Sequence, residues 1–200
     1  MESIALKILN LNAIVELEEE NERLQDIKEK EIRRRLIDEI WYKISDYDAH
    51  IFEFNYNEYM NKLSERGIGF VPIEKELVSE QWDALFSSLV SEDTKRNKKH
   101  YSDQFKWHLF SFELLPATYA SAAQEDFDAQ IKDTLYMFFQ YAREAYLIKD
   151  AYLLKADDLN VLGEFSTMEK ADMYVFNPSA KWTYVKTHEA SCGPYFFCAK

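Results

Sequence analysis

The chain has 200 residues, of which 47% are hydrophobic and 16% aromatic, and a formal net charge of −12 at pH 7. This composition predicts a folded protein with a packed core and excludes a disordered chain, which needs low hydrophobicity. Because the acidic excess repels phosphate groups, we expect neither nonspecific nucleic-acid binding nor attachment to anionic membranes.

The chain shows no signal of secretion or membrane insertion. The apolar run from Ile4 to Val15 lacks a basic region before it and a small-residue cleavage site after it, and no window approaches the ~18 uncharged apolar residues of a membrane helix. The two cysteines, Cys192 and Cys198, do not make a disulfide framework. We therefore expect a cytoplasmic protein.

The first expected element is helical and covers residues 13–46, which contain strong helix formers and no Gly or Pro. Apolar residues recur at a spacing near 3.5, but the seam breaks at Lys28 and Glu31, so a coiled coil is not expected. The pattern predicts one long amphipathic helix, or two with a break near residues 28–31. We expect its apolar face to pack on the rest of the chain and keep a homodimer through this helix as the alternative.

Residues 50–104 give mixed signals. The alternation of Phe52, Phe54 and Tyr56 is typical of a strand, whereas "YNEYMNKLSERG" favours a helix with Gly67 as its C-cap. "GIGFVPI" then predicts a short strand, and "EQWDALFSSLVSED" an amphipathic helix. The polar residues 91–104 predict a surface loop.

The next stretch predicts alternating strands and helices. "FKWHLFSFELL" is interpreted as a strand in the middle of a sheet, and "TLYMFFQY" as an aromatic strand buried on both faces. "SAAQEDFDAQI" predicts a short helix, and "AREAYLIKDAYLLKADDL" a longer one.

The clearest local signal is a hairpin in "DMYVFNPSAKWTYVKTHE", where two β-rich runs flank the turn residues Asn177-Pro178-Ser179. "GPYFFC" predicts a terminal edge strand. The order of elements predicts an α+β fold with a mainly antiparallel sheet, helices packed on one face and an N-terminal helical extension. We place the extension at residues 1–62 and the α+β domain at residues 63–200.

The segments "WHLFSFE", "YMFFQYAREAYLIKDAYLLKADDL", "DMYVFNPSAKWTYVKTHE" and "CGPYFF" resemble an uncharacterised bacterial family typical of spore-forming Gram-positive organisms. The shared motifs are WH-x-FS-aromatic-E, FFQ, WTYV-x-THE and GPYF. The resemblance covers roughly residues 65–197 and extends to the Trp-containing stretch "EQWDALFSSL". It implies a bacterial protein with a domain of unknown function, and it assigns no activity.

Two histidines and a carboxylate form a candidate metal-ligand set in this sequence. His108, His188 and Glu189 would be a legitimate zinc or iron set if their strands were neighbours. No ligands share the close spacing of one element, and adjacent strand residues such as His188 and Glu189 point to opposite faces. We therefore expect no metal, and Thr187-His188-Glu189 is interpreted as the end of the last hairpin strand.

Cys192 is a candidate nucleophile, with His188 as base and Glu113 or Glu189 as the group that orients the base. The acidic chain disfavours a thiolate, and no cysteine-hydrolase signature surrounds Cys192. Ser111 does not lie in a G-x-S-x-G elbow. No G-x-G-x-x-G or Walker-A sequence is present, so no nucleotide cofactor is expected.

These observations favour a non-enzymatic cytosolic protein-binding module, similar in kind to inhibitors and immunity proteins, that meets a basic protein partner through an acidic surface. Residues 1–61 support this function with fifteen acidic and eight basic side chains. The alternative is a small metal- or histidine-dependent hydrolase that uses His108 and His188. The many strand aromatics are interpreted as core rather than as a nucleic-acid platform.

Overall fold

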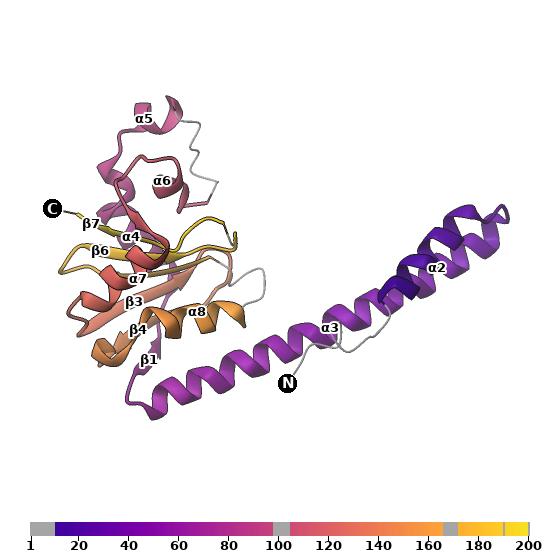
Figure 1. Ribbon diagram of the computed structural model, residues 1–200, viewed down its shortest axis with the longest axis horizontal. Coiled ribbons are helices and arrows are strands. Elements are labelled where there is room, and N and C mark those ends of the chain that lie inside the picture. The colour runs from indigo at the N-terminus through magenta and orange to yellow at the C-terminus, as the bar shows by residue number, and fades with distance from the viewer. Residues whose placement is uncertain (1–10, 98–104, 166–171, 190, 200) are drawn as a thin grey trace. The chain divides into compact units, whose positions relative to one another are not determined.

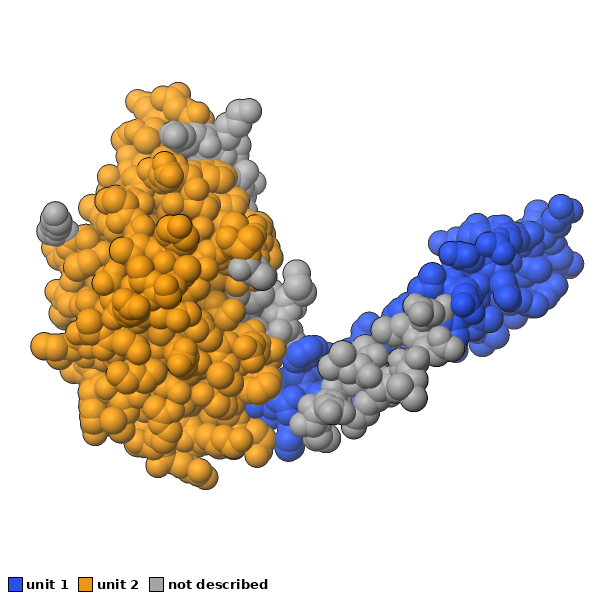
Figure 2. Space-filling model, viewed as in Figure 1, with its two compact units in different colours: residues 1–57 blue, residues 58–200 orange. Residues whose placement is uncertain are grey.

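The computed structural model of the chain describes residues 11–97, 105–165, 172–189 and 191–199. The chain divides into two compact units, Met1–Asn57 and Glu58–Lys200, which we call unit 1 and unit 2 (Figure 2). No described helix is long and apolar enough to cross a membrane.

Unit 1 is helical. Helix α2 covers Leu11–Arg23, and helix α3 begins at Ile27 and continues to Glu65 (Figure 1). The break lies at residues 24–26, slightly before the expected position, because Asp26 Oδ1 accepts hydrogen bonds from the backbone N–H groups of Lys28 and Glu29 and so caps α3. The strand option for residues 52–56 is wrong, since α3 runs through them.

Helix α3 ends at the predicted C-cap. Gly67 has φ +92°, a left-handed conformation that glycine adopts without the strain of a side chain. The N–H of Gly67 donates to the Ser64 carbonyl, and the N–H of Ile68 donates to the Leu63 carbonyl. These two hydrogen bonds form a Schellman motif. The expected short strand follows at once as β1.

Unit 2 is built on a seven-stranded antiparallel sheet with the order β1-β4-β3-β5-β6-β7-β2. Its strands are β1 Gly69–Pro72, β2 Thr118–Tyr119, β3 Thr134–Phe139, β4 Ala145–Lys149, β5 Met173–Asn177, β6 Trp182–Lys186 and β7 Tyr195–Cys198. The α+β class, the antiparallel sheet and the hairpin β5–β6 are confirmed. β7 is not the edge strand, because β2 pairs on its outer side.

The helices of unit 2 are α4 Lys75–Leu85, η1 Ser87–Leu89, α5 Glu92–Asn97, α6 His108–Ser111, α7 Ala120–Ala129, η2 Ala151–Leu153 and α8 Ala156–Glu164. They cover both faces of the sheet, and this corrects the expectation of a single covered face. Trp82 of α4 donates a hydrogen bond to Thr183 of β6, whereas Phe127 of α7 packs on Trp182 and Tyr184. Successive residues of β6 therefore serve opposite faces.

The segment expected as a central strand at residues 105–115 is instead a set of turns around α6. Two of its backbone N–H groups find side-chain partners in place of a strand ladder, and those from His108 to Phe112 donate to carbonyls three or four residues earlier. The N–H of Lys106 donates to Gln140 Oε1, and that of Trp107 donates to the Tyr174 hydroxyl. Leu109 and Phe110 nevertheless reach the core, and their burial accounts for the apolar pattern.

The helix expected from "AREAYLIKDAYLLKADDL" is also wrong in its first half. Residues 145–149 form β4, which is hydrogen-bonded on one side to β1 and on the other to β3. Asp150, with φ 53°, turns the chain into η2, and α8 follows. The hydrogen bonds that β4 forms with β1 and β3 decide its conformation, although the spacing of its apolar residues resembles that of a helix. Within the expected loop 91–104, residues 92–97 form α5, and residues 98–104 lie outside the described parts.

Candidate functional site

His108 and His188, 80 residues apart in the sequence, meet around one aromatic pair in unit 2. The ring centroid of Phe105 lies 5.4 Å from that of His108 and 4.8 Å from that of His188. The Trp107 ring lies 4.4 Å and 6.0 Å from the same two rings. The tertiary structure thus joins the "WH" and "THE" segments, and the two histidines do not lie on opposite faces of the sheet.

Asp172, which the sequence reasoning missed, holds His188. Its carboxylate is 2% exposed; Oδ1 lies 2.9 Å from both the backbone nitrogen and Nδ1 of His188. Because an ionised carboxylate only accepts hydrogen bonds, the proton is assigned to Nδ1, and Nε2 is left as the basic nitrogen. The hairpin register is the signal that could have found this contact, since Met173 pairs with Lys186 and Asp172 is one residue further along.

Glu189 and Cys192 lie next to this pair. Glu189 Oε1 lies 3.8 Å from His188 Nε2, and the Cys192 thiol donates to Glu189 Oε2 at 3.2 Å. The hydrogen bond to this carboxylate, followed by burial, raises the pKa of the Cys192 thiol. The thiol therefore stays protonated near neutral pH, and this argues against Cys192 as a nucleophile.

The remaining candidates make no such contacts. Glu113 is exposed after α6, with a left-handed φ of 55°, and it bonds to neither His188 nor Cys192 in the described chain. The Ser111 hydroxyl is buried in α6. Across the four described stretches, no group of three or more His, Cys, Asp or Glu side chains is placed to hold a metal ion. The set His108, His188 and Glu189 gains no support as a metal site.

His108 titrates abnormally, and this gives a testable pH dependence. Burial lowers the pKa of His108 below 6.5, although Glu189 and Asp172 act in the opposite direction. The unfolded chain therefore takes up this proton first, so the contribution of His108 to stability is complete above pH 6.5 and is lost as the pH falls through the folded pKa. We expect the free energy of unfolding to fall from pH 6.5 downward, with a slope for this group of at most about 1.4 kcal/mol per pH unit.

Urea unfolding of the wild type and of His108→Gln between pH 5 and 7.5 measures this effect. The variant should show a flatter profile below pH 6.5, while His50→Gln, at an exposed position of α3, should keep the wild-type profile. Identical slopes for wild type and His108→Gln would contradict the assignment.

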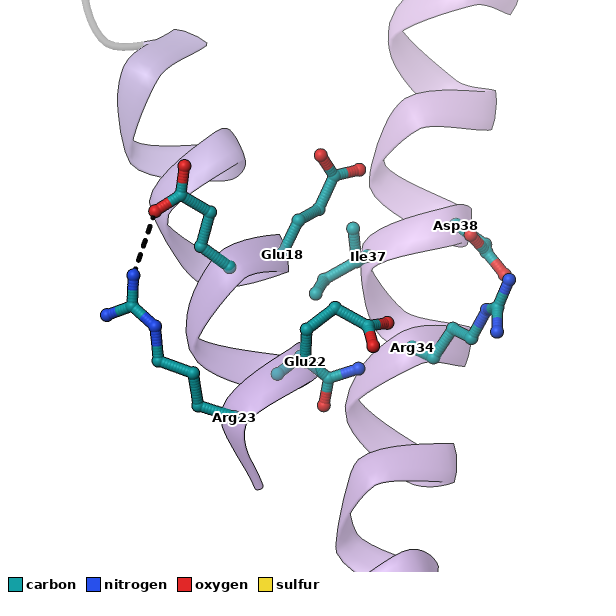
Figure 3. A pocket seen from close by; sticks show the side chains of 8 residues that line it. Glu18, Glu22, Arg23, Arg34, Ile37 and Asp38 are labelled. Atoms are coloured by element: carbon teal, nitrogen blue, oxygen red, sulfur yellow. Dashed lines mark hydrogen bonds and ion pairs between the residues drawn. The ribbon is translucent and has the colours of Figure 1, made fainter. Parts of the chain in front are cut away.

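A second candidate site is a groove of about 510 Å³ between α2 and α3 of unit 1 (Figure 3). Its lining is four acidic side chains, two arginines, an amide and an isoleucine: Glu18, Glu19, Glu22, Asp38, Arg23, Arg34, Asn21 and Ile37. Glu22 bonds to Lys30, which lowers the pKa of the Glu22 carboxyl. Glu18 accepts from the Trp41 indole. These two contacts join the helices on either side of the groove.

Asn21 distinguishes this groove from an ordinary charged surface. The residue is 3% exposed, and its Oδ1 has no hydrogen-bond partner within the described residues. A buried amide oxygen without a partner is costly and calls for a donor. The sequence pattern did not indicate that Asn21 is buried, because an asparagine within a glutamate-rich helix is expected to lie on the surface.

Comparison with known proteins gives one match. A family model described as "Domain of unknown function (DUF4275)" matches residues 57–196. No curated protein and no solved structure matches the chain. The histidine cluster lies within the matched residues, whereas the groove of unit 1 lies before them.

Proposed function

The chain belongs to the DUF4275 family, and because that description assigns no activity, we propose a function from the chain's own residues. We propose a non-enzymatic, cytoplasmic protein-binding module, inhibitor- or immunity-like, whose acidic surface receives a basic protein partner. The groove between α2 and α3 is the proposed point of contact.

The observation that carries this proposal is the buried Asn21 oxygen in the lining of an acidic groove. A lysine or arginine side chain of a partner supplies the N–H donor that Oδ1 lacks. Four carboxyl side chains and two arginines line the groove; Glu19 is paired with Arg23 at 3.2 Å, and the remaining excess of negative charge offsets the positive charge of such a side chain. One inserted basic side chain would therefore satisfy both the amide and the excess negative charge.

The acidic field of unit 1 supports the same partner chemistry. Five glutamates lie on α2: Glu16, Glu18, Glu19, Glu20 and Glu22. A field of one sign speeds the encounter with a partner of the opposite sign, and salt weakens this effect. Binding is therefore expected to fall as the ionic strength rises.

A native pull-down with mass spectrometry, run at about 0.05 M and about 0.5 M salt, tests the proposal. The wild type should retain basic proteins at low salt. The double variant Glu19→Lys/Asp38→Lys should bind them at least about tenfold more weakly, since charged contacts typically contribute 1.5–3 kcal/mol. The matched control Glu16→Lys/Glu20→Lys makes the same change of charge outside the groove and should retain them.

Asn21→Leu separates binding from folding. It removes the amide oxygen without a partner, so the chain should be at least as stable to urea as the wild type while its binding of basic proteins weakens. A wild-type chain that emerges alone at low salt, or a control variant that loses the partner equally, would refute the proposal.

One observation favours a second candidate, a histidine-dependent hydrolase. Asp172 fixes His188 with Nε2 as the basic nitrogen, the arrangement of a general base with an orienting carboxylate. His108 shares the same aromatic pair. The test is hydrolysis of p-nitrophenyl acetate and of p-nitrophenyl phosphate. Activity that is lost in His188→Gln and retained in His50→Gln would support this candidate. Equal rates in both variants would exclude it.

A further inference from the structure

Helix α3 carries an exposed apolar stripe that neither the histidine cluster nor the acidic groove uses. It consists of Ile32, Leu36, Ile40, Tyr47 and Phe54, and we call it the α3 stripe. Its members are 40–61% exposed. At about 1.5 Å per residue the stripe is about 33 Å long. Scattered exposed apolar residues are ordinary, but a set that recurs on one side of a helix marks an interaction surface, here with Lys43 and His50 at the same angle.

The five residues share one side of α3. Each residue turns the helix by about 100°, so Ile32, Leu36 and Ile40 fall within about 80° of one another, and Tyr47 and Phe54 lie between them in angle. Ile37, which faces Ile14 in the small core of unit 1, lies about 100° away from the middle of the stripe. Arg34 and Asp38 of the groove lie on the other side of Ile37 (Figure 3).

The core of unit 1 is too small to account for so long a helix. Its described cluster consists of Ile14, Ile37 and Ile44, with Trp41 packed against it. Helices in water derive most of their stability from packing an apolar face, not from propensity. Ile51, Tyr56 and Leu63 of the same helix are buried as well, so the stripe is a second apolar face left in water, and such a face indicates a surface that is covered in the functional protein.

We infer that the α3 stripe pairs with the α3 stripe of a second copy of this chain, with the two helices antiparallel. Charge complementarity selects this occupant. Glu39 and Lys43 are both exposed. At about 100° per residue, Lys43 lies within the angle of the stripe and Glu39 lies just beyond its edge, both on the same side of its middle. In an antiparallel two-fold pair centred near Trp41, Glu39 of each copy lies level with Lys43 of the other.

The same two residues decide the direction of pairing. In a parallel pair in register, Lys43, which lies near the middle of the stripe, faces Lys43 of the other copy and this contact repels, whereas the two Glu39 side chains lie on opposite sides of the interface. In the antiparallel pair the contact between Glu39 and Lys43 attracts, and the two-fold axis repeats it once. Tyr47 of one copy then lies level with Arg35 of the other, between Ile32 and Leu36 of the stripe, whereas Phe54 lies level with Lys28, beyond the end of the stripe.

Sedimentation equilibrium and light scattering of the full chain test the pairing. We expect the wild type to form a dimer with a dissociation constant in the micromolar range. For Leu36→Asp we expect a dissociation constant at least a hundredfold higher. Leu77→Asp introduces the same change at an equally exposed leucine of α4 and should stay dimeric. A wild-type monomer at 100 μM (roughly the upper end of transient pairs), or a Leu36→Asp variant as dimeric as the wild type, overturns the inference.

A charge exchange tests the direction. Glu39→Lys alone and Lys43→Glu alone each turn two attractive contacts into repulsive ones, so each variant should dimerise about tenfold more weakly. The double variant Glu39→Lys/Lys43→Glu should recover wild-type affinity, and an equimolar mixture of the single variants should form heterodimers. A double variant as weak as the single ones rules out the antiparallel arrangement.

The inference does not depend on the proposed acidic groove. The groove variant Glu19→Lys/Asp38→Lys should remain dimeric, and Leu36→Asp should still retain basic proteins at low salt. A monomeric wild type that binds basic proteins contradicts only the dimer, whereas a dimer that retains no basic protein contradicts only the groove.

Discussion

Replacing Trp82 with alanine is expected to lower the free energy of unfolding of unit 2 by about 3–5 kcal/mol, the range for truncating a fully buried large aromatic. Trp82 is completely buried at the centre of the larger core. Its ring centroid lies 5.3 Å from that of Tyr174 and 5.4 Å from that of Phe86. The indole N–H also donates to Thr183 Oγ1 at 2.9 Å. The substitution leaves a cavity and a buried hydroxyl without its donor.

Urea unfolding followed by circular dichroism measures this loss. Trp82→Phe keeps most of the ring contacts but removes the indole N–H, so its loss should be smaller than that of the alanine variant. Leu77→Ala changes a 64% exposed side chain on the same helix and should stay within about 0.5 kcal/mol of the wild type. A Trp82→Ala variant as stable as Leu77→Ala would show that α4 does not pack on β5 and β6 as described.

Replacing Asp172 with alanine is expected to cost about 2–3 kcal/mol, because hydrogen bonds to a buried charged group are stronger than average and their removal leaves unmet donors. The carboxylate accepts from both the backbone and the ring of His188. It thereby ties the chain after β6 to the residue before β5. Loss of this tie should also release the His188 ring from its fixed tautomer.

Two measurements separate these effects. Urea unfolding gives the stability, and nitrogen-15 spectra of the histidine rings report which nitrogen of His188 carries the proton. Asp172→Asn, which keeps one acceptor oxygen, should lose less stability than Asp172→Ala. An alanine variant with wild-type stability and an unchanged His188 tautomer would mean that Asp172 does not hold the ring.

Local signals in the sequence predicted the elements that depend on neighbours in the chain. The hairpin β5–β6 followed from two β-rich runs around Asn177, and β3 from its aromatic run. Gly67 marked the end of α3 because a left-handed C-cap is a local requirement. Each of these signals acts over a few residues, so no knowledge of the fold was needed.

The predictions failed where distant partners decided the conformation. Residues 105–111 bond to Gln140 and Tyr174 instead of to a strand. Residues 145–149 pair with β1 and β3 instead of forming a helix. In both segments the apolar spacing reported burial correctly, but burial alone does not distinguish a strand from a helix or a turn.

The candidate site shows the same division. His108, His188, Glu189 and Cys192 were named from the sequence, and the structure brings His108 to His188 and Cys192 to Glu189. Asp172 was missed because its importance comes from the register of β5 against β6. Asn21 was missed because only the packing of α2 on α3 buries it.

The sequence by itself determined the α+β class, the family resemblance, the acidic character of the helical N-terminus and the residues with chemical potential. Only the tertiary structure decided which faces of the sheet the helices cover, which titratable groups share one site and which apolar face of α3 is left in water. The physical reason is one of range. Propensity, capping and charge act between residues close in the chain, whereas register, burial and hydrogen-bond pairing are set by contacts that form only when distant segments meet.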